Sequence, residues 1–232
     1  MKIIAHRCGT DVFPQQTIHS ARYSLEHGAD LVEVDIRFTK DNVPVVIHDP
    51  TPLFLYGAVT PVRLITAKKF LSLRRTADPS FCGHTFKDYL DCGIENMLFH
   101  IKEGGERLDM ILSMCDKKGI LDKVVFGVSS VEDVNIVKNY DKNIKVLAFM
   151  PSAGRIEDFA EAGADYIRLW QGWLNEDNIS RVKATGKELW IMANNGFDVG
   201  EVEDGDYELF ASTGAEGLLI NKVLPAVEFF RK

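Results

Sequence analysis

The chain has 232 residues, with 46% hydrophobic and 26% charged side chains, which is typical of one globular domain with a hydrophobic core. Its net charge of −7, without a basic cluster, excludes the electrostatic footprint of a nucleic-acid-binding protein. The sequence has no apolar run of about 18 residues, no secretory signal pattern and no closely paired cysteines, so we expect a cytoplasmic protein with free thiols and no membrane span.

Eight short runs rich in Val, Ile, Leu and Phe predict β-strands along the chain. They lack strict alternation of polar and apolar residues, which is typical of parallel strands that are buried on both faces of a sheet. The predicted strands span residues 2–6, 31–36, 96–102, 123–128, 145–150, 165–170, 188–193 and 216–220.

Amphipathic segments between these strands predict helices, and most of them end at a glycine just before the next strand. They span residues 17–27, 108–118, 131–139, 155–162, 176–185 and 207–212. Eight strands that mostly alternate with helices favour an α/β fold of the (β/α)8 TIM-barrel type over an open doubly wound sheet, which usually has fewer strands. No glycine-rich motif of the usual nucleotide sites follows a strand.

The region after the second strand departs from this alternation. An Asp-Asn pair at 41–42 predicts a turn, so residues 37–47 are expected to form a β-hairpin. Residues 51–93 contain three prolines and one helical stretch at 67–73. Because long structured loops on a barrel are usually functional, we expect residues 51–93 to be an inserted lid within a single TIM-barrel domain of residues 1–232.

Charged and imidazole side chains lie at the ends of the first three predicted strands and of the hairpin. In a (β/α)8 barrel the C-terminal ends of the strands form one rim, and the active site lies there. Glu33 and Asp35 are two residues apart on one strand, so they share one face, and the same holds for His100 and Lys102. The side chains expected to meet at this rim are those of His6, Arg7, Glu33, Asp35, His48, Asp49, His100 and Lys102.

These groups fit the steps of metal-assisted phosphodiester cleavage. Glu33 and Asp35 would bind a divalent ion through hard oxygen ligands, and the ion would polarise the phosphoryl oxygens. His6 and His48 titrate near neutral pH and could act as general base and general acid. Two cationic side chains would hold the phosphate and offset its developing charge: Arg7 and Lys102.

Each residue also has a structural interpretation. The acidic pair could form ion pairs with Arg63 or Arg74, and Lys102 could simply neutralise one of the two carboxylates. His100 could be a core histidine. Three tryptophans of the later strands could stack on an organic headgroup or cation, or could only pack in the core: Trp170, Trp173 and Trp190.

The sequence resembles the glycerophosphodiester phosphodiesterases, a family of phospholipase-C-like (β/α)8 barrels. The family's opening motif, H-R-G followed by five residues and P-E-N-T, appears here as H-R-C at 6–8 and P-Q-Q-T at 14–17. Its E-x-D and H-D motifs appear at 33–35 and 48–49. The resemblance spans nearly the whole chain and is strongest over residues 3–50. It implies metal-dependent hydrolysis of a glycerophosphodiester to glycerol 3-phosphate, or a related phosphomonoester, and an alcohol.

The resemblance also implies roles for individual residues. His6 and His48 would be the acid/base pair, and residues 51–93 would cover the alcohol moieties. The phosphate would be held by Arg7, with a further positive charge from Lys102. The divalent ion, which could be Mg²⁺, Ca²⁺, Mn²⁺ or Zn²⁺, would be held by Glu33, Asp35 and His100.

Several positions depart from the family pattern. His100 stands where the family has a third acidic ligand, which lowers the ligand charge and moves the preference toward Mn²⁺, Fe²⁺ or Zn²⁺. Gln15 and Gln16 replace Glu and Asn of P-E-N-T, and Asn221 replaces a closing Asp, so we expect a weaker supporting shell.

Two other functions therefore stay open. The same site could cleave a phospholipid headgroup or a sugar phosphodiester, or the chain could be a degenerate barrel that only binds a phosphate-bearing ligand. In all three cases the expected partner is a small molecule rather than a nucleic acid. The sequence leaves the oligomeric state and the alcohol moiety undetermined.

Overall fold

The computed structural model describes residues 1–196 and 198–231 and contains a closed barrel of parallel strands. Going round the barrel, the strands follow the order β1, β12, β9, β8, β7, β6, β5 and β2, and pairing of β1 with β2 closes the ring. The TIM-barrel prediction is confirmed. The barrel strands are β1 (Lys2–Ala5), β2 (Leu31–Phe38), β5 (Met97–Ile101), β6 (Val124–Val128), β7 (Lys145–Ala148), β8 (Tyr166–Trp170), β9 (Glu188–Met192) and β12 (Gly217–Ile220).

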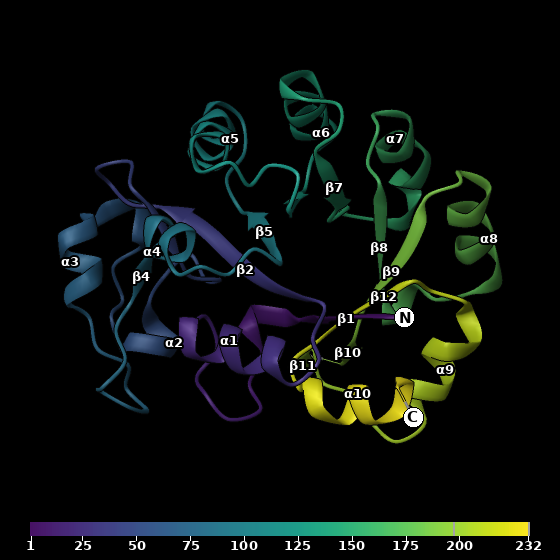
Figure 1. Cartoon of the computed structure of the whole chain (residues 1–232), viewed down its shortest axis with the longest axis horizontal. Coiled ribbons are helices and arrows are strands. Elements are labelled where there is room, and N and C mark those ends of the chain that lie inside the picture. The colour runs from purple at the N-terminus through teal and green to yellow at the C-terminus, as the bar shows by residue number, and fades with distance from the viewer. Residues whose placement is uncertain (197, 232) are drawn as a thin grey trace.

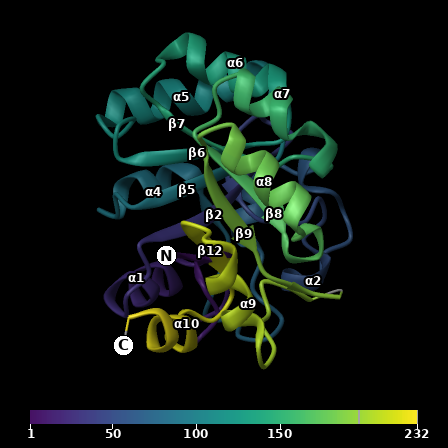
Figure 2. The ribbon, with the colours of Figure 1, turned by 90° about the vertical axis from the view of Figure 1, so that its right-hand side faces the viewer.

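Helices surround these strands on the outside (Figures 1 and 2), as their amphipathic sequences predict. All six predicted helices form within one or two residues of the expected ends. The helices that follow the barrel strands are α1 (Ile18–Glu26), α4 (Phe86–Asp91), α5 (Glu106–Lys118), α6 (Val131–Tyr140), α7 (Ile156–Glu161), α8 (Glu176–Ala184), α9 (Asp206–Thr213) and α10 (Val223–Phe230). Short elements at the rim are η1 (His6–Cys8), η3 (Ala153–Arg155), η4 (Gln171–Trp173), β10 (Asn194–Asn195) and β11 (Asp198–Val199).

The predicted hairpin forms because β2 continues past the barrel and pairs antiparallel with β3 (Pro44–Val46). The Ile47 amide also donates a hydrogen bond to the Asp35 carbonyl at 3.1 Å, so the returning chain comes back to the barrel rim. His48 therefore follows directly after a residue that is bonded to the second barrel strand. A third short strand, β4 (His84–Thr85), pairs with β3 and was not predicted.

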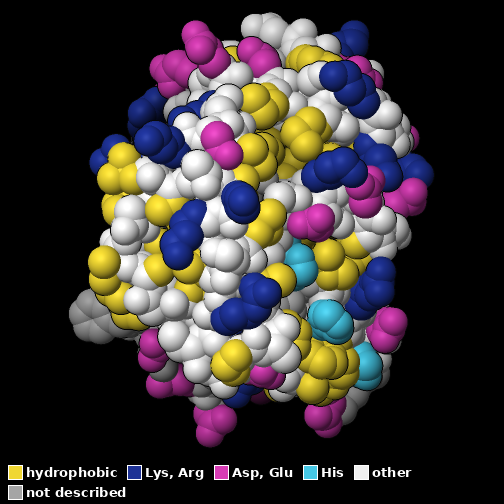
Figure 3. All heavy atoms as spheres, turned by 90° about the vertical axis from the view of Figure 1, so that its left-hand side faces the viewer, with side chains coloured by type: hydrophobic (Ala, Val, Ile, Leu, Met, Phe, Trp, Pro, Cys, Tyr) yellow, Lys and Arg dark blue, Asp and Glu magenta, His cyan; other side chains and the backbone are white. Residues whose placement is uncertain are grey.

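The insertion, residues 51–93, lies at one side of the barrel (left in Figure 1). It contains α2 (Leu53–Tyr56), η2 (Val62–Leu64) and α3 (Ala67–Ser72), and it has its own small hydrophobic cluster around Tyr56 and Phe70. Its last helix, α4, instead packs into the barrel core through Phe86 and Tyr89. By packing, α4 is thus the barrel helix between β2 and β5. The surface on this side mixes Lys and Arg with hydrophobic side chains (Figure 3).

Side chains fill the barrel interior, so that the barrel is a packed core and not a pore. Trp190 is fully buried and stacks on Tyr166 with ring centroids 4.4 Å apart. It thus has the packing role that the sequence left open. The other buried members of this inner cluster are Ile4, Leu98, Val125, Leu147, Phe149, Met192 and Leu219. No helix of the described chain is both long and apolar enough to cross a bilayer.

Candidate active site

A cavity of about 380 Å³ lies at the C-terminal ends of the barrel strands. Five of the seven predicted site residues line it, and Glu33 and Asp35 lie fully buried beside His100. None of the described lining residues belongs to the insertion, so its role as a lid stays a prediction. The lining residues are His6, Arg7, His48, His100, Lys102, Ser129, Phe149, Arg168, Trp170, Met192 and Val199.

Three ligand atoms converge beside the floor of this cavity. Strand pairing sets Asp35 opposite His100, with Glu33 two residues earlier on the same face of β2. One ligand atom from each of Glu33, Asp35 and His100 lies within 4.8 Å of the other two, as ligands of one ion do. Glu33 Oε1 is buried without a hydrogen-bond partner, and the nearest cation to the cluster, Lys102, pairs with Asp35 Oδ1 instead. An orphaned buried acceptor is costly unless a cation satisfies it, so these residues fit a divalent ion.

Lys102 supplies one positive charge to this cluster. Its Nζ lies 2.8 Å from Asp35 Oδ1 and 2.9 Å from His100 Nδ1. Burial raises the pKa of Asp35, but Lys102 and His100 outweigh it and hold that pKa well below its ordinary value. Burial and the Asp35 carboxylate raise the pKa of Glu33. The ion-pair partner of Asp35 is thus Lys102 and neither of the insertion arginines considered from the sequence.

His100 has the form that a metal ligand needs. Burial, followed by the charge of Lys102, lowers the pKa of His100 to about 3, so its ring is neutral. Since Lys102 donates to Nδ1, the Nδ1 lone pair points toward the positive charge. Phe149 stacks on the imidazole ring of His100, with ring centroids 3.7 Å apart.

The segment after β1 is held against the acidic pair by an unusual backbone. Arg7, Cys8 and Gln16 all have positive φ values, of 51°, 72° and 57°. Residues other than glycine rarely adopt this left-handed conformation, and it is concentrated where surrounding contacts enforce it. Here it lets the Arg7 amide donate to Glu33 Oε2 at 2.7 Å.

The two substituted glutamines remain in contact with the site. Gln16 Nε2 donates to Asp35 Oδ2 at 2.5 Å, and the Gln15 side-chain oxygen accepts a 3.2 Å bond from the Arg7 guanidinium. The supporting contacts around the metal ligand and the phosphate-binding candidate therefore persist in spite of both changes.

The partner of His6 fixes its tautomer. The Asn221 amide nitrogen donates to the Val199 carbonyl at 2.9 Å and to Glu201 Oε1 at 2.8 Å, so its oxygen faces His6 Nδ1 at 2.8 Å. His6 Nδ1 must therefore carry the proton and donate, which leaves the Nε2 lone pair free. Burial, followed by the charge of Arg7, lowers the pKa of His6 to about 3.

His48 has a charged partner instead of an amide. Its Nδ1 lies 2.8 Å from Asp49 Oδ1, and the Arg37 guanidinium holds the His48 carbonyl at 2.7 Å. Burial lowers the pKa of His48, while Asp35 and Asp49 oppose the shift. Burial thus lowers the pKa of both imidazoles, but the carboxylate partner of His48 favours the protonated ring more than the amide partner of His6 does.

The far wall of the cavity contains a residue that the sequence analysis missed. Arg168 is only 3% exposed and lies on β8, with its guanidinium carbon 4.2 Å from the Trp170 ring centroid. A single charged residue within an otherwise apolar strand was the signal that could have identified it.

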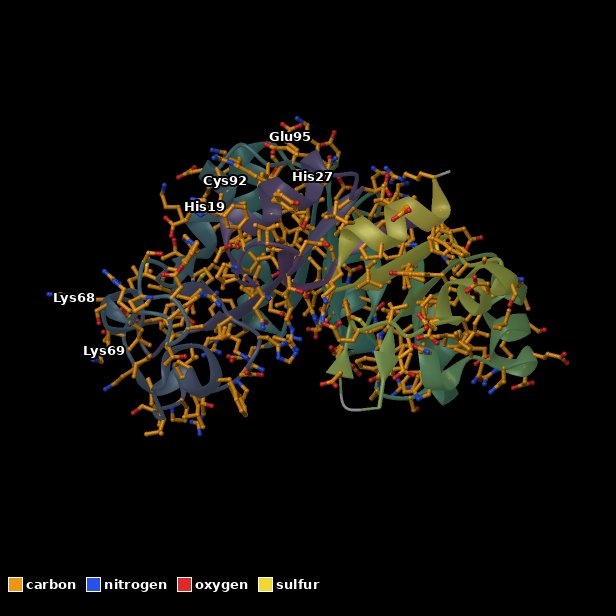
Figure 4. All side chains as sticks on the ribbon, turned by 90° about the horizontal axis from the view of Figure 1, so that it is seen from below. His19, His27, Lys68, Lys69, Cys92 and Glu95 are labelled. Carbon is orange, nitrogen blue, oxygen red and sulfur yellow. The ribbon has the colours of Figure 1, made fainter. Side chains whose placement is uncertain are left out.

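Other imidazoles and cavities do not share these features. His19 on α1 and His27 directly after α1 are exposed (Figure 4) and do not line the cavity. A larger cavity of about 520 Å³ lies near α9 and α10, but its acidic side chains make it unsuitable for an anionic phosphate. The smaller cavity on the barrel rim is therefore the candidate site. The acidic side chains of the larger cavity are Glu201, Glu203, Asp204 and Glu208.

Comparison with known proteins agrees with this geometry. The profile of the Glycerophosphoryl diester phosphodiesterase family matches residues 6–156, which is more than half of the chain. The chain belongs to this family. Glycerophosphodiester phosphodiesterase 1 of Rattus norvegicus is 48% identical over 48 residues, a match that covers 21% of this chain and 14% of the rat protein. The glycerophosphodiester phosphodiesterase of Caldanaerobacter subterraneus is 45% identical over 49 residues, covering 21% of this chain and 20% of that protein.

A solved structure supports the family fold over the full length. A phosphodiesterase from Oleispira antarctica, crystallised in complex with the product sn-glycerol-3-phosphate, superposes with a TM-score of 0.85 at 14% identity. The match covers 100% of this chain and 97% of that one. At such low identity this likeness concerns the glycerophosphodiester phosphodiesterase fold alone.

Proposed function

We propose that this protein hydrolyses glycerophosphodiesters to glycerol 3-phosphate, or a related phosphomonoester, and an alcohol, with the help of a divalent ion. The observation that carries the proposal is the cavity itself. Two imidazoles with unlike partners, an amide for His6 and a carboxylate for His48, line the same cavity beside two buried carboxylates, one of which has an oxygen without a hydrogen-bond partner. A protein that only bound phosphate would need no such pair for proton transfer.

Glu33, Asp35 and His100 would hold the divalent ion. Two carboxylates and one neutral imidazole are a donor set that suits Mn²⁺, Fe²⁺ or Zn²⁺. The bound ion would act as a Lewis acid that polarises a phosphoryl oxygen of the substrate. Gln16 and the Arg7 amide would keep the two carboxylates oriented through the bonds described above, as outer-shell partners of metal ligands do.

The two imidazoles would then transfer the protons. His6 Nε2, with its free lone pair, would accept a proton from the attacking water as the new P–O bond forms. His48 would donate its proton to the leaving alkoxide as the old P–O ester bond breaks, because Asp49 stabilises its charged form. The cations at the cavity, Arg7 and Lys102, would stabilise the charge that develops on the phosphoryl oxygens.

Steady-state assays on a panel of glycerophosphodiesters, each with Mg²⁺, Ca²⁺, Mn²⁺ and Zn²⁺, test this function. We expect His6→Ala and His48→Ala to lower turnover by about 10²- to 10⁴-fold, the usual contribution of a positioned acid or base. His27→Ala, at an exposed imidazole directly after α1, is the matched control and should keep full activity.

Two results would contradict the proposal. One is a wild-type protein that cleaves no diester of the panel with any of the four ions. The other is normal turnover in both imidazole variants. If both variants bind glycerol 3-phosphate as well as the inactive wild type does, the barrel is a phosphate-binding protein and not an enzyme.

A further inference from the structure

Arg168 is a buried cation without an anionic partner. Its side chain is 3% exposed, and its one hydrogen bond is a 3.3 Å contact from Nη2 to the Met150 carbonyl. Nε and Nη1 are buried with no acceptor at all, and no carboxylate of the described residues forms an ion pair with it. Burial lowers the pKa of Arg168 to about 9, which leaves the guanidinium charged at neutral pH.

A charged group in this condition is unfavourable, because its donors lose water and gain nothing in return. The side chain lines the same cavity as the two imidazoles, so a ligand in that cavity can reach it. An anionic group of a ligand could therefore accept the hydrogen bonds that these donors do not make within the protein.

Arg168 is not bonded to the metal-binding cluster. Phe149 stacks on the imidazole of His100, and the Arg168 guanidinium lies 5.4 Å from the centroid of the same ring. Phe149 is thus a neighbour of both the metal-binding cluster and this cation. Arg7 and Lys102 line the same cavity and already provide two cations for the reacting phosphate.

The aromatic rings around Arg168 cannot bind a cationic headgroup. The guanidinium lies 4.2 Å from the Trp170 ring centroid and 5.4 Å from that of Trp173, so it occupies the cation–π position itself. A choline or ethanolamine ammonium at this place would meet a like charge at short range. The two tryptophans therefore position the arginine instead of binding an organic cation.

We propose that Arg168 is a specificity residue, which binds a second anionic group, a carboxylate or a phosphate, on one of the two alcohols that flank the reacting phosphate. This inference rests on the proposed phosphodiesterase function. It predicts that the preferred diester has a negative charge in addition to that of the phosphodiester.

Two substrates that differ by one carboxylate test the inference. Glycerophosphoserine and glycerophosphoethanolamine share the glycerol, the phosphate and the ammonium group. We expect the wild-type kcat/KM to be about 10- to 100-fold higher for the serine diester, the usual effect of a charge-assisted hydrogen bond. A third diester, whose alcohol has a phosphate monoester, distinguishes whether a carboxylate or a phosphate is the better anion.

Variants then assign the preference to this side chain. Arg168→Met should reduce the ratio between the two substrates to near one, by lowering kcat/KM for the serine diester while leaving the ethanolamine diester nearly unchanged. Arg168→Lys should restore part of the ratio. Arg22→Met, an exposed arginine on α1, is the matched control and should keep the wild-type ratio.

Equal wild-type kcat/KM for the two diesters would overturn the inference, and so would an Arg168→Met variant that loses both activities equally. The second result would mean that Arg168 holds the reacting phosphate. If the wild type cleaves no diester, the proposed function fails, but binding of O-phosphoserine against O-phosphoethanolamine by calorimetry still tests Arg168. A preference of less than twofold there would reject the anion site as well.

Discussion

The two halves of the barrel rim differ in whether their charged side chains have partners of opposite charge or hydrogen-bonding neighbours. The half with the proposed catalytic residues, called the catalytic side here, is formed by β1, β2, the hairpin and β5, and its two carboxylates are bonded to neighbouring groups, although Glu33 Oε1 and Arg7 Nε have no hydrogen bond. Lys102 pairs with Asp35, Gln16 donates to Asp35, and the Arg7 amide donates to Glu33. On the recognition side, formed by the ends of β7 and β8, Arg168 lies among Phe149, Trp170 and Trp173 with two nitrogens unbonded.

This difference indicates what each half does. A network that is bonded within itself keeps its geometry before the substrate arrives, which is the condition for electrostatic stabilisation of a transition state. A buried donor without an acceptor gains a hydrogen bond only from a ligand that offers an acceptor, so it discriminates between ligands. Changes on the catalytic side should therefore alter the rate for all diesters, and changes on the recognition side should alter the ratio between them.

The largest effect on the catalytic side is expected for Glu33→Gln. The amide oxygen of the new side chain can still accept the Arg7 amide, so the fold should persist while the charged metal ligand is lost. For wild type at a metal concentration of 100 Kd, binding should stabilise the fold by about 2.7 kcal/mol, or roughly 5–10 °C in Tm. We expect the variant to lose most of this shift and turnover on every diester.

Thermal unfolding with and without Mn²⁺ or Zn²⁺ measures this directly, and a chelator should reverse the wild-type shift. Glu176→Gln, an exposed residue at the start of α8, is the matched control. A variant that keeps the full metal-dependent shift would show that Glu33 is not a ligand.

The sequence predicted which residues of the catalytic side lie together because its signals are local. Two acids two residues apart on an apolar strand must share a face, and the hairpin turn must return the chain to the rim. In β8 the comparable signal was Arg168, a lone charge between Ile167 and Leu169. The sequence does not show the partners of a side chain: that Arg168 forms no ion pair with a described carboxylate depends on the tertiary packing around it.

The insertion illustrates a second limit. Its cluster around Tyr56 and Phe70 is separate from the barrel core, yet α4 at its end belongs to that core. The six-residue helix is too short for a clear amphipathic period, although Thr85 and Asp88 form a capping box that marks its start. Boundaries of this kind depend on tertiary packing, which a local pattern does not specify.

An intermediate effect is expected for Asn221→Asp, which gives His6 a carboxylate in place of an amide. A negative partner favours the charged ring, so the pKa of His6 should rise from about 3 toward its ordinary value. His6 must be neutral to accept a proton, and the acidic limb of the kcat/KM profile should therefore move to higher pH. Activity should fall between about pH 4.5 and 6.5 and stay nearly unchanged above pH 7.

The pH profile is measured at saturating metal, and the imidazole pKa by NMR titration. The substitution also removes the amide donations to the Val199 carbonyl and to Glu201 Oε1, so thermal unfolding of the variant is measured beside the profile. Superimposable profiles for wild type and variant would mean that His6 is not the base. An equal fall in kcat/KM at every pH would mean that Asn221 acts through packing alone.

The smallest effect is expected at Phe149, the ring shared by the two halves. The Phe149 ring stacks on the imidazole of His100, and the Arg168 guanidinium lies 5.4 Å from the centroid of the Phe149 ring. Phe149→Leu keeps an apolar side chain but removes the stacking, which is worth about 0.5–1.5 kcal/mol. Because the ring supports both groups, metal affinity and the serine-to-ethanolamine ratio should each fall, by about two- to tenfold. Metal titration and the paired diester assay on one preparation measure both quantities. A change in only one of them would mean that the two halves of the rim are independent, and that Phe149 belongs to the half whose property changed.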